Sequence, residues 1–288
     1  MNTEGMFKLY QKELFSLAYR MLGSVMDAED IVQEAFIKFD QLPRKESIQN
    51  ERAYLYKMVT NRCIDLLRSS SKQRETYKGT WLPEPLVEKN DQKDPSALYL
   101  QRETISTAYL LLLQKLNAVE RAVFILREVF NYSYDEIADN VEKSQENCRQ
   151  IYHRAKKSIL TDSEEIPSVA VGENHIKSFV KHLMDEDTEK LLELVSEEVI
   201  LYTDGGGKVR VAGIPVVGFQ AVMRLNQNLL RMYEGQFSYS FHTVNGLPGI
   251  RIQFDESIDR QFVYSFAFRD GKVEKIYAVA NPDKLRHI

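Results

Sequence analysis

The chain has 288 residues, of which 43% are hydrophobic and 28% charged, and its formal net charge at pH 7 is −4. This length allows two or more globular domains. No run of about 18 apolar residues occurs, so we expect no membrane span and no membrane partner. The first fourteen residues lack the apolar core of a signal peptide, which predicts a cytoplasmic protein. Because the net charge is negative, nucleic-acid binding must be argued from local basic clusters.

The spacing of apolar residues divides the chain into helical and mixed parts. Up to about residue 160 the spacing is helical, and after about residue 173 two helical stretches precede segments that alternate like strands. The expected strands include Val199–Thr203, Lys208–Ala212, Phe237–Val244, Gln261–Arg269 and Val273–Val279. We expect helical domains at 1–69 and 96–162, linkers at 70–95 and 163–172, and an α+β domain at 173–288. Cys63 and Cys148 fall on apolar helix faces, where we expect core residues without a metal.

Residues 27–39 predict an amphipathic helix with an unusual outer face. Its inward stripe consists of Ala28, Ile31, Val32, Ala35 and Phe39. The opposite side carries Asp27, Asp30, Gln33, Glu34 and Ile37. An exposed isoleucine among acidic residues favours docking onto another protein, with Ile37 as a small apolar anchor. The alternative is an ordinary solvated face with one stray apolar residue.

Residues 51–68 predict a second helix with two different faces. The inward side consists of Leu55, Val59, Cys63, Leu66 and Leu67. The outer side carries Tyr54, Lys57, Asn61 and Arg68. Cations that follow a phosphate backbone, an aromatic ring that stacks and an amide that reads an extruded base are typical of single-stranded DNA binding. The alternative is again a solvated helix face.

The segment 117–159 carries a helix-turn-helix pattern. Asn117 and Ser133 each precede a glutamate by three residues, as in a capping box, and Ser144 can cap a third helix. The inner stripe of that helix is Cys148, Ile151, Tyr152, Ala155 and Ile159, which leaves Arg149, Gln150, His153 and Lys157 outside, flanked by Arg154 and Lys156. Such a face suits the major groove. The alternative is an ordinary three-helix bundle. One such helix usually binds weakly, so a second contact or partner is expected.

Taken in order, these segments resemble the extracytoplasmic-function sigma factors. Residues 27–36 are similar to the part of conserved region two that docks on the polymerase clamp helices, and residues 50–68 to the part that melts and reads the minus-10 element. Residues 133–157 are similar to the region-four helix-turn-helix that reads the minus-35 element. The resemblance implies core RNA polymerase and promoter DNA as partners. Tyr54 stands where many members have tryptophan, and a tyrosine still stacks.

Three further strings resemble signatures of a subgroup that carries a C-terminal SnoaL-like domain of the NTF2-like fold. They are Trp81-Leu-Pro83-Glu-Pro85 in the linker, Asp204-Gly205-Gly206-Gly207-Lys208 in the extension, and Asn281-Pro282-Asp283-Lys284-Leu285 near the end. In this subgroup the extension is understood to act on the sigma core in cis. We therefore hypothesise that the second and third strings contact the sigma core or the linker and bias promoter binding.

The C-terminal domain leaves other roles open. Its fold commonly forms a cone with an apolar pocket, so an unidentified small ligand is one expectation. The candidates for acid–base chemistry are Asp204, His182, His242 and Asp255, and no pair has a telling spacing. The glycine string is interpreted, in isolation, as a tight turn between two strands. We expect a non-enzymatic sigma factor without a cofactor; the competing hypotheses are a ligand-sensing helix-turn-helix regulator and a polyketide-cyclase-like enzyme fused to a DNA-binding module.

Overall fold

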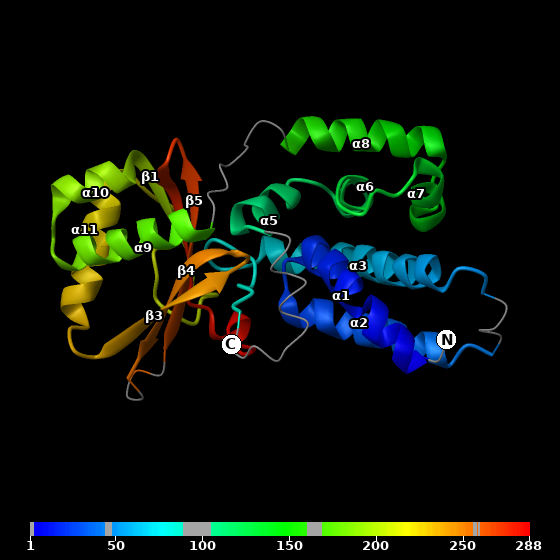
Figure 1. Cartoon of the computed structure of the whole chain (residues 1–288), viewed down its shortest axis with the longest axis horizontal. Helices are drawn as coiled ribbons and strands as arrows, with labels where there is room; N and C mark the ends of the chain where they lie inside the picture. The colour runs from blue at the N-terminus through cyan, green and yellow to red at the C-terminus, as the bar shows by residue number, and fades with distance from the viewer. Residues whose placement is uncertain (1–2, 44–47, 89–104, 160–168, 256–257, 259) are drawn as a thin grey trace. The chain divides into compact units, whose positions relative to one another are not determined.

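The computed structural model describes residues 3–43, 48–88, 105–159, 169–255, 258 and 260–288 (Figure 1). The chain forms two compact units. The helical unit consists of Met1–Glu75 and Leu110–Ser163, and the C-terminal unit consists of Thr76–Tyr109 and Glu164–Ile288. The segment after residue 75, which the sequence predicts as a linker between helical domains, thus belongs to the C-terminal unit.

The first part of the helical unit contains α1 (Thr3–Leu22), α2 (Val25–Asp40) and α3 (Glu51–Glu75). Ser24 caps α2, and its hydroxyl accepts a hydrogen bond from the Asp27 N–H at 3.1 Å. The five inward residues predicted for α2 are all buried. Helix α3 continues beyond the predicted boundary at residue 69, because no glycine or proline interrupts the sequence before Gly79.

Helix α5 (Thr107–Leu113) begins in the C-terminal unit and ends in the helical unit, whose second part continues with α6 (Ala118–Glu128), α7 (Tyr134–Val141) and α8 (Gln145–Ile159). Both predicted capping boxes are confirmed, at Asn117 with Glu120 and at Ser133 with Glu136. The five residues predicted as the inner stripe of α8 are buried, which confirms the orientation of that helix. Helix α7 ends where Glu142 adopts a left-handed conformation with φ 53°.

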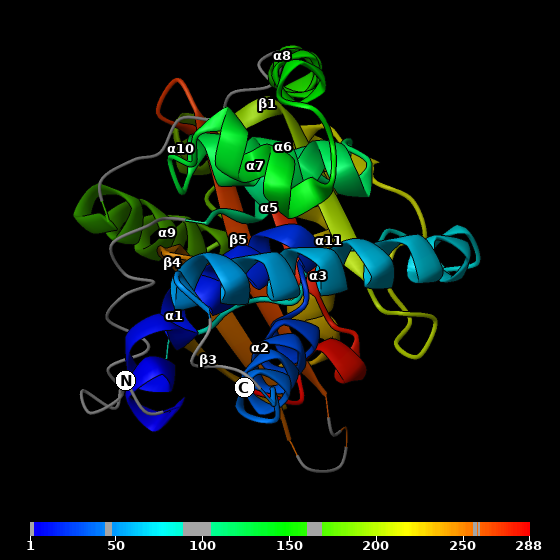
Figure 2. The same cartoon turned by 90° about the vertical axis from the view of Figure 1, so that its right-hand side faces the viewer.

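Helix α3 packs on two sides within the helical unit (Figure 2). It contacts α1 and α2 on one side and α6 and α7 on the other. The Tyr56 ring lies 5.4 Å from that of Phe130 and 5.2 Å from that of Tyr132, measured between centroids. The buried guanidinium of Arg121 in α6 also donates a hydrogen bond to the Met21 carbonyl. The sequence predicts only one inward face for α3, so the burial of Tyr56, Thr60 and Ile64 is a finding of the structure.

The C-terminal unit is an α+β domain, which confirms the predicted fold class. Its helices are α9 (Val169–Met184), α10 (Thr188–Leu194) and α11 (Phe219–Met232), and its strands are β1 (Val195–Asp204), β2 (Val216–Val217), β3 (Phe237–Val244), β4 (Leu247–Phe254), β5 (Gln261–Arg269) and β6 (Lys272–Val279), followed by a 3₁₀ turn at Pro282–Lys284. The strands form one sheet in the order β2-β1-β6-β5-β4-β3, in which β1 and β6 pair in parallel. Helix α9 begins inside the segment 163–172 that the sequence analysis treats as a linker.

One face of this sheet packs against the three helices (Figure 1). The shared core includes Phe179 of α9, Val222 of α11, Leu201 of β1 and Phe266 of β5, all buried. Every second residue of β5 from Tyr264 to Phe268 contributes to this core, as expected for side chains that alternate between the two faces of a strand. None of the helices in the described part of the chain is long and apolar enough to cross a membrane.

The strand predicted at Lys208–Ala212 is wrong. Asp204 ends β1, and the N–H groups of Lys208 and Val209 both bond to the Gly205 carbonyl, which closes a turn. Gly206 and Gly207 have φ values of 59° and 72°, a conformation that glycine adopts without strain. The partner of β1 at this edge is instead Val216–Val217. A third helix, α11, follows it, where the sequence analysis expects only strands.

Candidate functional sites

The predicted docking face of α2 is exposed in the structure. Asp27, Asp30 and Gln33 are exposed, and the Ile37 side chain is 58% exposed, which is unusual for a large apolar residue. Glu34 is different, because it forms ion pairs with Lys38 at 2.7 Å and with Arg62 of α3 at 3.0 Å. The hydrogen bond from Lys38 holds the pKa of Glu34 below its usual value. The structure therefore leaves an exposed apolar side chain, Ile37, with three exposed polar residues on the same helix.

The predicted minus-10 face of α3 is less open. Tyr54 is half-buried and its ring makes an edge contact with Phe39, with 5.9 Å between centroids. Asn61 is half-buried as well. Asn61 and Arg68 line a polar cleft whose other wall includes Val119, Val141, Glu142 and Lys143 from around α6 and α7. Asn61, which is predicted to read a base, therefore faces the part of the helical unit that contains α6 and α7.

The outer face of α8 is fully available. Arg149, Gln150, His153, Arg154 and Lys157 are all exposed. Ser144 caps the helix, and its hydroxyl accepts from the Asn147 N–H at 3.2 Å. Arg149 donates to Gln145 Oε1 at 3.1 Å and lies 5.4 Å from the ring centroid of Tyr134, so its orientation is partly fixed. Lys156, expected to flank this face, instead bonds Glu128 at 2.6 Å.

Residues 77–88 of the linker dock on the C-terminal unit around a buried ion pair. Asp204 is fully buried, and its Oδ2 lies 2.7 Å from the Lys284 Nζ, itself only 6% exposed. Burying two charges is costly unless further hydrogen bonds satisfy them. Residues of the linker provide those bonds. Tyr77 Oη donates to Asp204 Oδ1 at 2.6 Å, and the Leu82 N–H donates to Oδ2 at 2.9 Å.

The cation of this pair is also held by the linker. Lys284 Nζ donates to the Leu82 carbonyl and lies 4.0 Å from the ring centroid of Trp81 and 5.0 Å from that of Tyr77. Asn281 donates from Nδ2 to Tyr77 Oη at 2.9 Å. Burial raises the pKa of Tyr77, and its bond to Asp204 adds to the rise, so its hydroxyl stays protonated as a donor.

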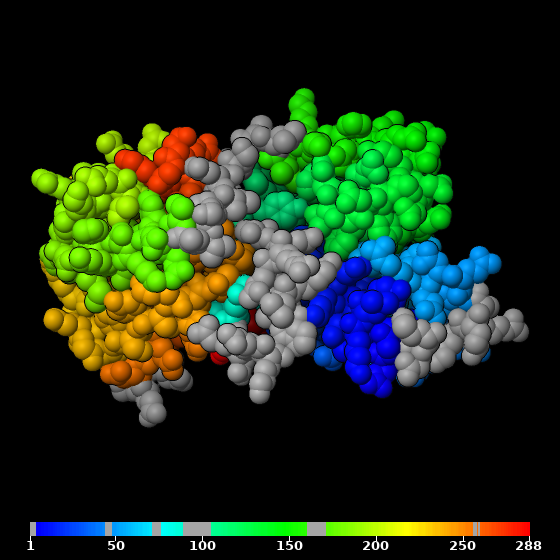
Figure 3. All heavy atoms as spheres, viewed as in Figure 1, coloured from blue at the N-terminus to red at the C-terminus, as the bar shows by residue number. Residues whose placement is uncertain are grey.

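A second group of contacts fixes the end of the linker. The Leu86 N–H donates to Asn245 Oδ1 at 3.2 Å, and the Asn245 N–H donates to the Leu86 carbonyl at 2.8 Å. Val87 forms an antiparallel bridge with Val244 at the end of β3. The space-filling view shows the cyan atoms of this segment beside the orange strands of the same unit (Figure 3). Pro83 and Pro85, between the two groups of contacts, are buried.

The structure thus brings the three predicted strings together. Gly206 is required there, because an added Cβ would lie 2.2 Å from the Asn281 Nδ2. Gly205 and Gly207 complete the turn. The exposed pair of Lys208 and Asp283, 2.5 Å apart, joins the second and third strings. Pro282 begins the 3₁₀ turn, and Leu285 is buried. Sequence reasoning missed Tyr77, Asn245 and the backbone of Leu82, for which the sequence contains no spacing signal.

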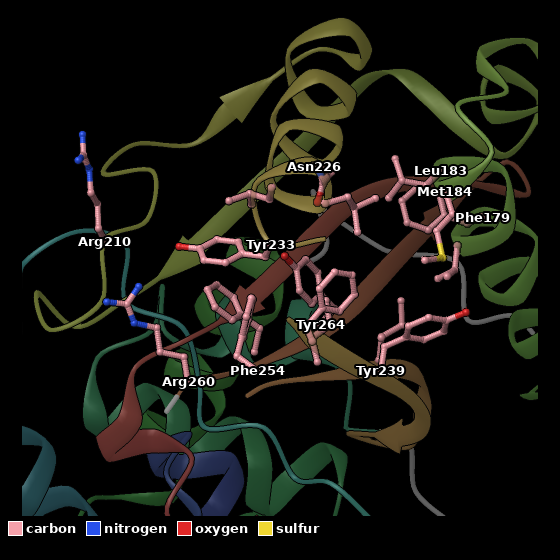
Figure 4. Close-up of a pocket in the computed structure, with 17 residues that line it drawn as sticks. Phe179, Leu183, Met184, Arg210, Asn226, Tyr233, Tyr239, Phe254, Arg260 and Tyr264 are labelled. Carbon is pink, nitrogen blue, oxygen red and sulfur yellow. The ribbon is translucent and has the colours of Figure 1, made fainter. Parts of the chain in front are cut away.

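An apolar cavity lies between the helices and the sheet of the C-terminal unit (Figure 4). Its lining consists mainly of aromatic and aliphatic side chains. The four acid–base candidates do not meet there. Asp204 is occupied by the linker, His242 on β3 bonds Ser240, and neither His182 nor Asp255 is among the residues that line the cavity.

Comparison with known proteins decides the family. A model described as Sigma-70 region 2 matches residues 6–73, and one described as Sigma-70, region 4 matches residues 106–159. The chain is 32% identical to the ECF RNA polymerase sigma factor SigJ of Mycobacterium tuberculosis, over 97% of this chain and 92% of that relative. The chain belongs to the ECF RNA polymerase sigma factors.

The likeness to ECF sigma factors extends over the C-terminal unit. The probable ECF RNA polymerase sigma factor SigI of Mycobacterium tuberculosis is 27% identical over 97% of this chain and 93% of its own length. The crystal structure of Mycobacterium tuberculosis SigJ matches with a TM-score of 0.80 and 29% identity, and covers 98% of both chains. Both matches therefore span the helical sigma regions, the linker and the α+β extension.

We predict that replacing Lys284 with methionine releases the linker. The substitution keeps an unbranched side chain, one heavy atom shorter, and leaves Asp204 buried without its cation, which costs about 3–5 kcal/mol. Amide hydrogen exchange across residues 77–88, and at Leu82 above all, should become faster.

Two matched variants make this test specific. Lys208→Met removes an exposed cation and should leave the exchange nearly unchanged, since exposed pairs contribute little. The double variant D204N/K284M, which removes both charges, should be more protected than K284M alone. Equal exchange in K284M and the wild type would show that the ion pair does not hold the linker.

Proposed function

We propose that this protein binds core RNA polymerase through α2, reads promoter DNA through α3 and α8, and is regulated in cis by its C-terminal unit. It acts in the cytoplasm, where the polymerase and its promoters are found. The observation that carries the regulatory part is the buried Asp204–Lys284 pair, whose hydrogen bonds and ring contacts come from the linker between the two sigma regions.

The polymerase contact rests on Ile37 and its neighbours. A 58% exposed isoleucine costs solvation free energy unless a partner covers it, and Asp27, Asp30 and Gln33 form a polar rim around it. An apolar centre with a polar rim is the usual anatomy of a protein interface. Glu34 has a different role in this proposal, because its pairs with Lys38 and Arg62 join α2 to α3.

Promoter reading requires the two halves of the helical unit to separate. The minus-10 and minus-35 elements lie about 25 base pairs apart, or roughly 85 Å along the duplex. In the compact unit the rings of Tyr56 and Tyr132 are only 5.2 Å apart, and Asn61 faces the second half. We therefore infer that the arrangement described is a closed state, and that the polymerase stabilises an open one by binding both halves.

The C-terminal unit regulates this opening through the linker. A docked segment 77–88 restricts the connection between the two DNA-reading halves. If residues 77–88 take another position in the polymerase complex, their contacts with Asp204, Lys284 and Asn245 must first break. The regulation is then a coupling free energy between linker docking and promoter binding. The apolar cavity is proposed to serve binding, because its described lining contains no carboxylate or imidazole for acid–base catalysis.

We expect Ile37→Asp to weaken binding to purified core polymerase by about tenfold or more, because the substitution places a charge at the centre of the interface. Leu9→Asp on α1 is the matched control, since Leu9 is 55% exposed and lies outside the proposed face. Affinity measured by fluorescence anisotropy should be near that of the wild type for the control. Equal losses in both variants would contradict the assignment of the α2 face.

Tyr54→Ala should reduce open-complex formation by about tenfold, the effect of losing one stacked base. Tyr54→Phe keeps the ring and its contact with Phe39, and should act like the wild type. Fluorescence of 2-aminopurine placed in the minus-10 element, with core polymerase present, measures the melting. If phenylalanine behaves like alanine, the ring does not stack on a base and the α3 assignment fails.

A chain that ends near residue 165 should give a promoter output different from that of the full chain by at least severalfold, while its affinity for core polymerase stays within about twofold. Promoter-specific transcription with purified core polymerase measures the first quantity. Lys284→Met in the full chain should shift output in the same direction, and Lys208→Met should not. Unchanged output in the shortened chain would refute cis regulation.

A further inference from the structure

The cavity of the C-terminal unit has a lining that is almost entirely aromatic or aliphatic. Rings from β3, β4 and β5 and from Tyr233, just after α11, surround it, among them Tyr239, Phe254 and Tyr264. Leu183 and Met184 of α9 close one end (Figure 4). Burial raises the pKa of Tyr264 to about 12, so this phenol is neutral under ordinary conditions. An apolar lining of this kind suits a small molecule whose body is apolar.

The charges at this cavity are all of one sign. Arg210 and Arg260 contribute to its lining, and no described lining residue is acidic. Figure 4 shows both guanidinium groups on the same side of the cavity, the side toward which the Tyr233 hydroxyl also points. Leu183, Met184 and Phe179 lie on the opposite side. The cavity therefore has a cationic end and an apolar end.

Neither guanidinium group has a hydrogen-bond or ion-pair partner among the residues that the structure describes. Other arginines of the unit do: Arg231 bonds Glu186 at 2.7 Å, and Arg251 bonds Gln261 at 2.9 Å. An anionic group of a ligand at this side of the cavity would gain a charge-assisted hydrogen bond from a guanidinium group. The exposure of both side chains keeps this effect moderate and sensitive to salt.

We propose that the cavity binds a small amphipathic anion, with a flat aromatic body among the rings and a carboxylate or similar group at Arg210 and Arg260. The aromatic lining selects a flat body, because aromatic rings pack against one another by stacking and edge contacts. The guanidinium groups select an anion with oxygen acceptors, which arginine binds through paired N–H donors. This inference goes beyond the proposed function and does not depend on how the linker regulates the sigma regions.

The test uses two dyes that share one aromatic body. The first is 1-anilinonaphthalene-8-sulfonate, and the second is N-phenyl-1-naphthylamine, which lacks the sulfonate. Titration of the full chain, followed by dye fluorescence, should give tighter binding of the sulfonate, with a preference that falls as NaCl is raised. Arg210→Gln and Arg260→Gln should each weaken the sulfonate about three- to tenfold and leave the neutral dye within about twofold.

Two control variants locate the binding. Arg224→Gln removes an exposed arginine of α11 that does not line the cavity, and should change neither dye. Leu230→Trp fills the cavity from the same helix and should abolish both, with an unchanged circular dichroism spectrum showing that the fold persists. Equal affinity for the two dyes, an equal loss in Arg224→Gln, or sulfonate binding that survives Leu230→Trp in the folded protein would each overturn the proposal.

Discussion

The C-terminal unit depends on one buried ion pair. Asp204 and Lys284 lie almost out of contact with water, where an ionised side chain is stable only if every polar atom has a partner. Apart from the Gly206 N–H, which donates to Asp204 Oδ1 at 3.0 Å, those partners come from Tyr77, Trp81 and Leu82, more than a hundred residues earlier in the chain than Asp204. The pair and the linker therefore need each other: without the linker the charges are left unsatisfied, and without the charges the linker loses its central contacts.

The helical unit is organised by a different constraint, the two-sided burial of α3. One side of this helix packs against α1 and α2, and the other carries Tyr56 into contact with Phe130 and Tyr132. Aromatic contacts of this kind are worth about 1 kcal/mol each beyond the area they bury. A few such contacts can hold α3 against α6 and α7, and they can still break when a large partner binds both parts of the helical unit.

Periodic features were predictable from the sequence, and long-range polar contacts were not. The helices around Ile37, Tyr54 and Arg149 follow from apolar spacing, and the caps at Asn117 and Ser133 from local residue order. The second buried side of α3 has no separate periodic signal, because tyrosine and threonine suit both core and surface. The false strand at Lys208–Ala212 shows the limit of alternation, since the turn closed at Gly205 directs the chain away from the sheet. Backbone donors such as Leu82 N–H occur at every residue, so no pattern singles one out.

The docking of residues 77–88 has a consequence for how far the sigma regions can move apart. The chain that joins α3 to α6 is attached to the C-terminal unit again at Thr107, whose hydroxyl lies 2.8 Å from that of Ser265. Residues held at either of these two places cannot extend when the two DNA-reading halves move apart. An extended chain covers about 3.5 Å per residue, so release of the twelve docked positions would lengthen the tether by roughly 40 Å. The C-terminal unit would thus set the largest distance by which the two DNA-reading halves can separate on a promoter.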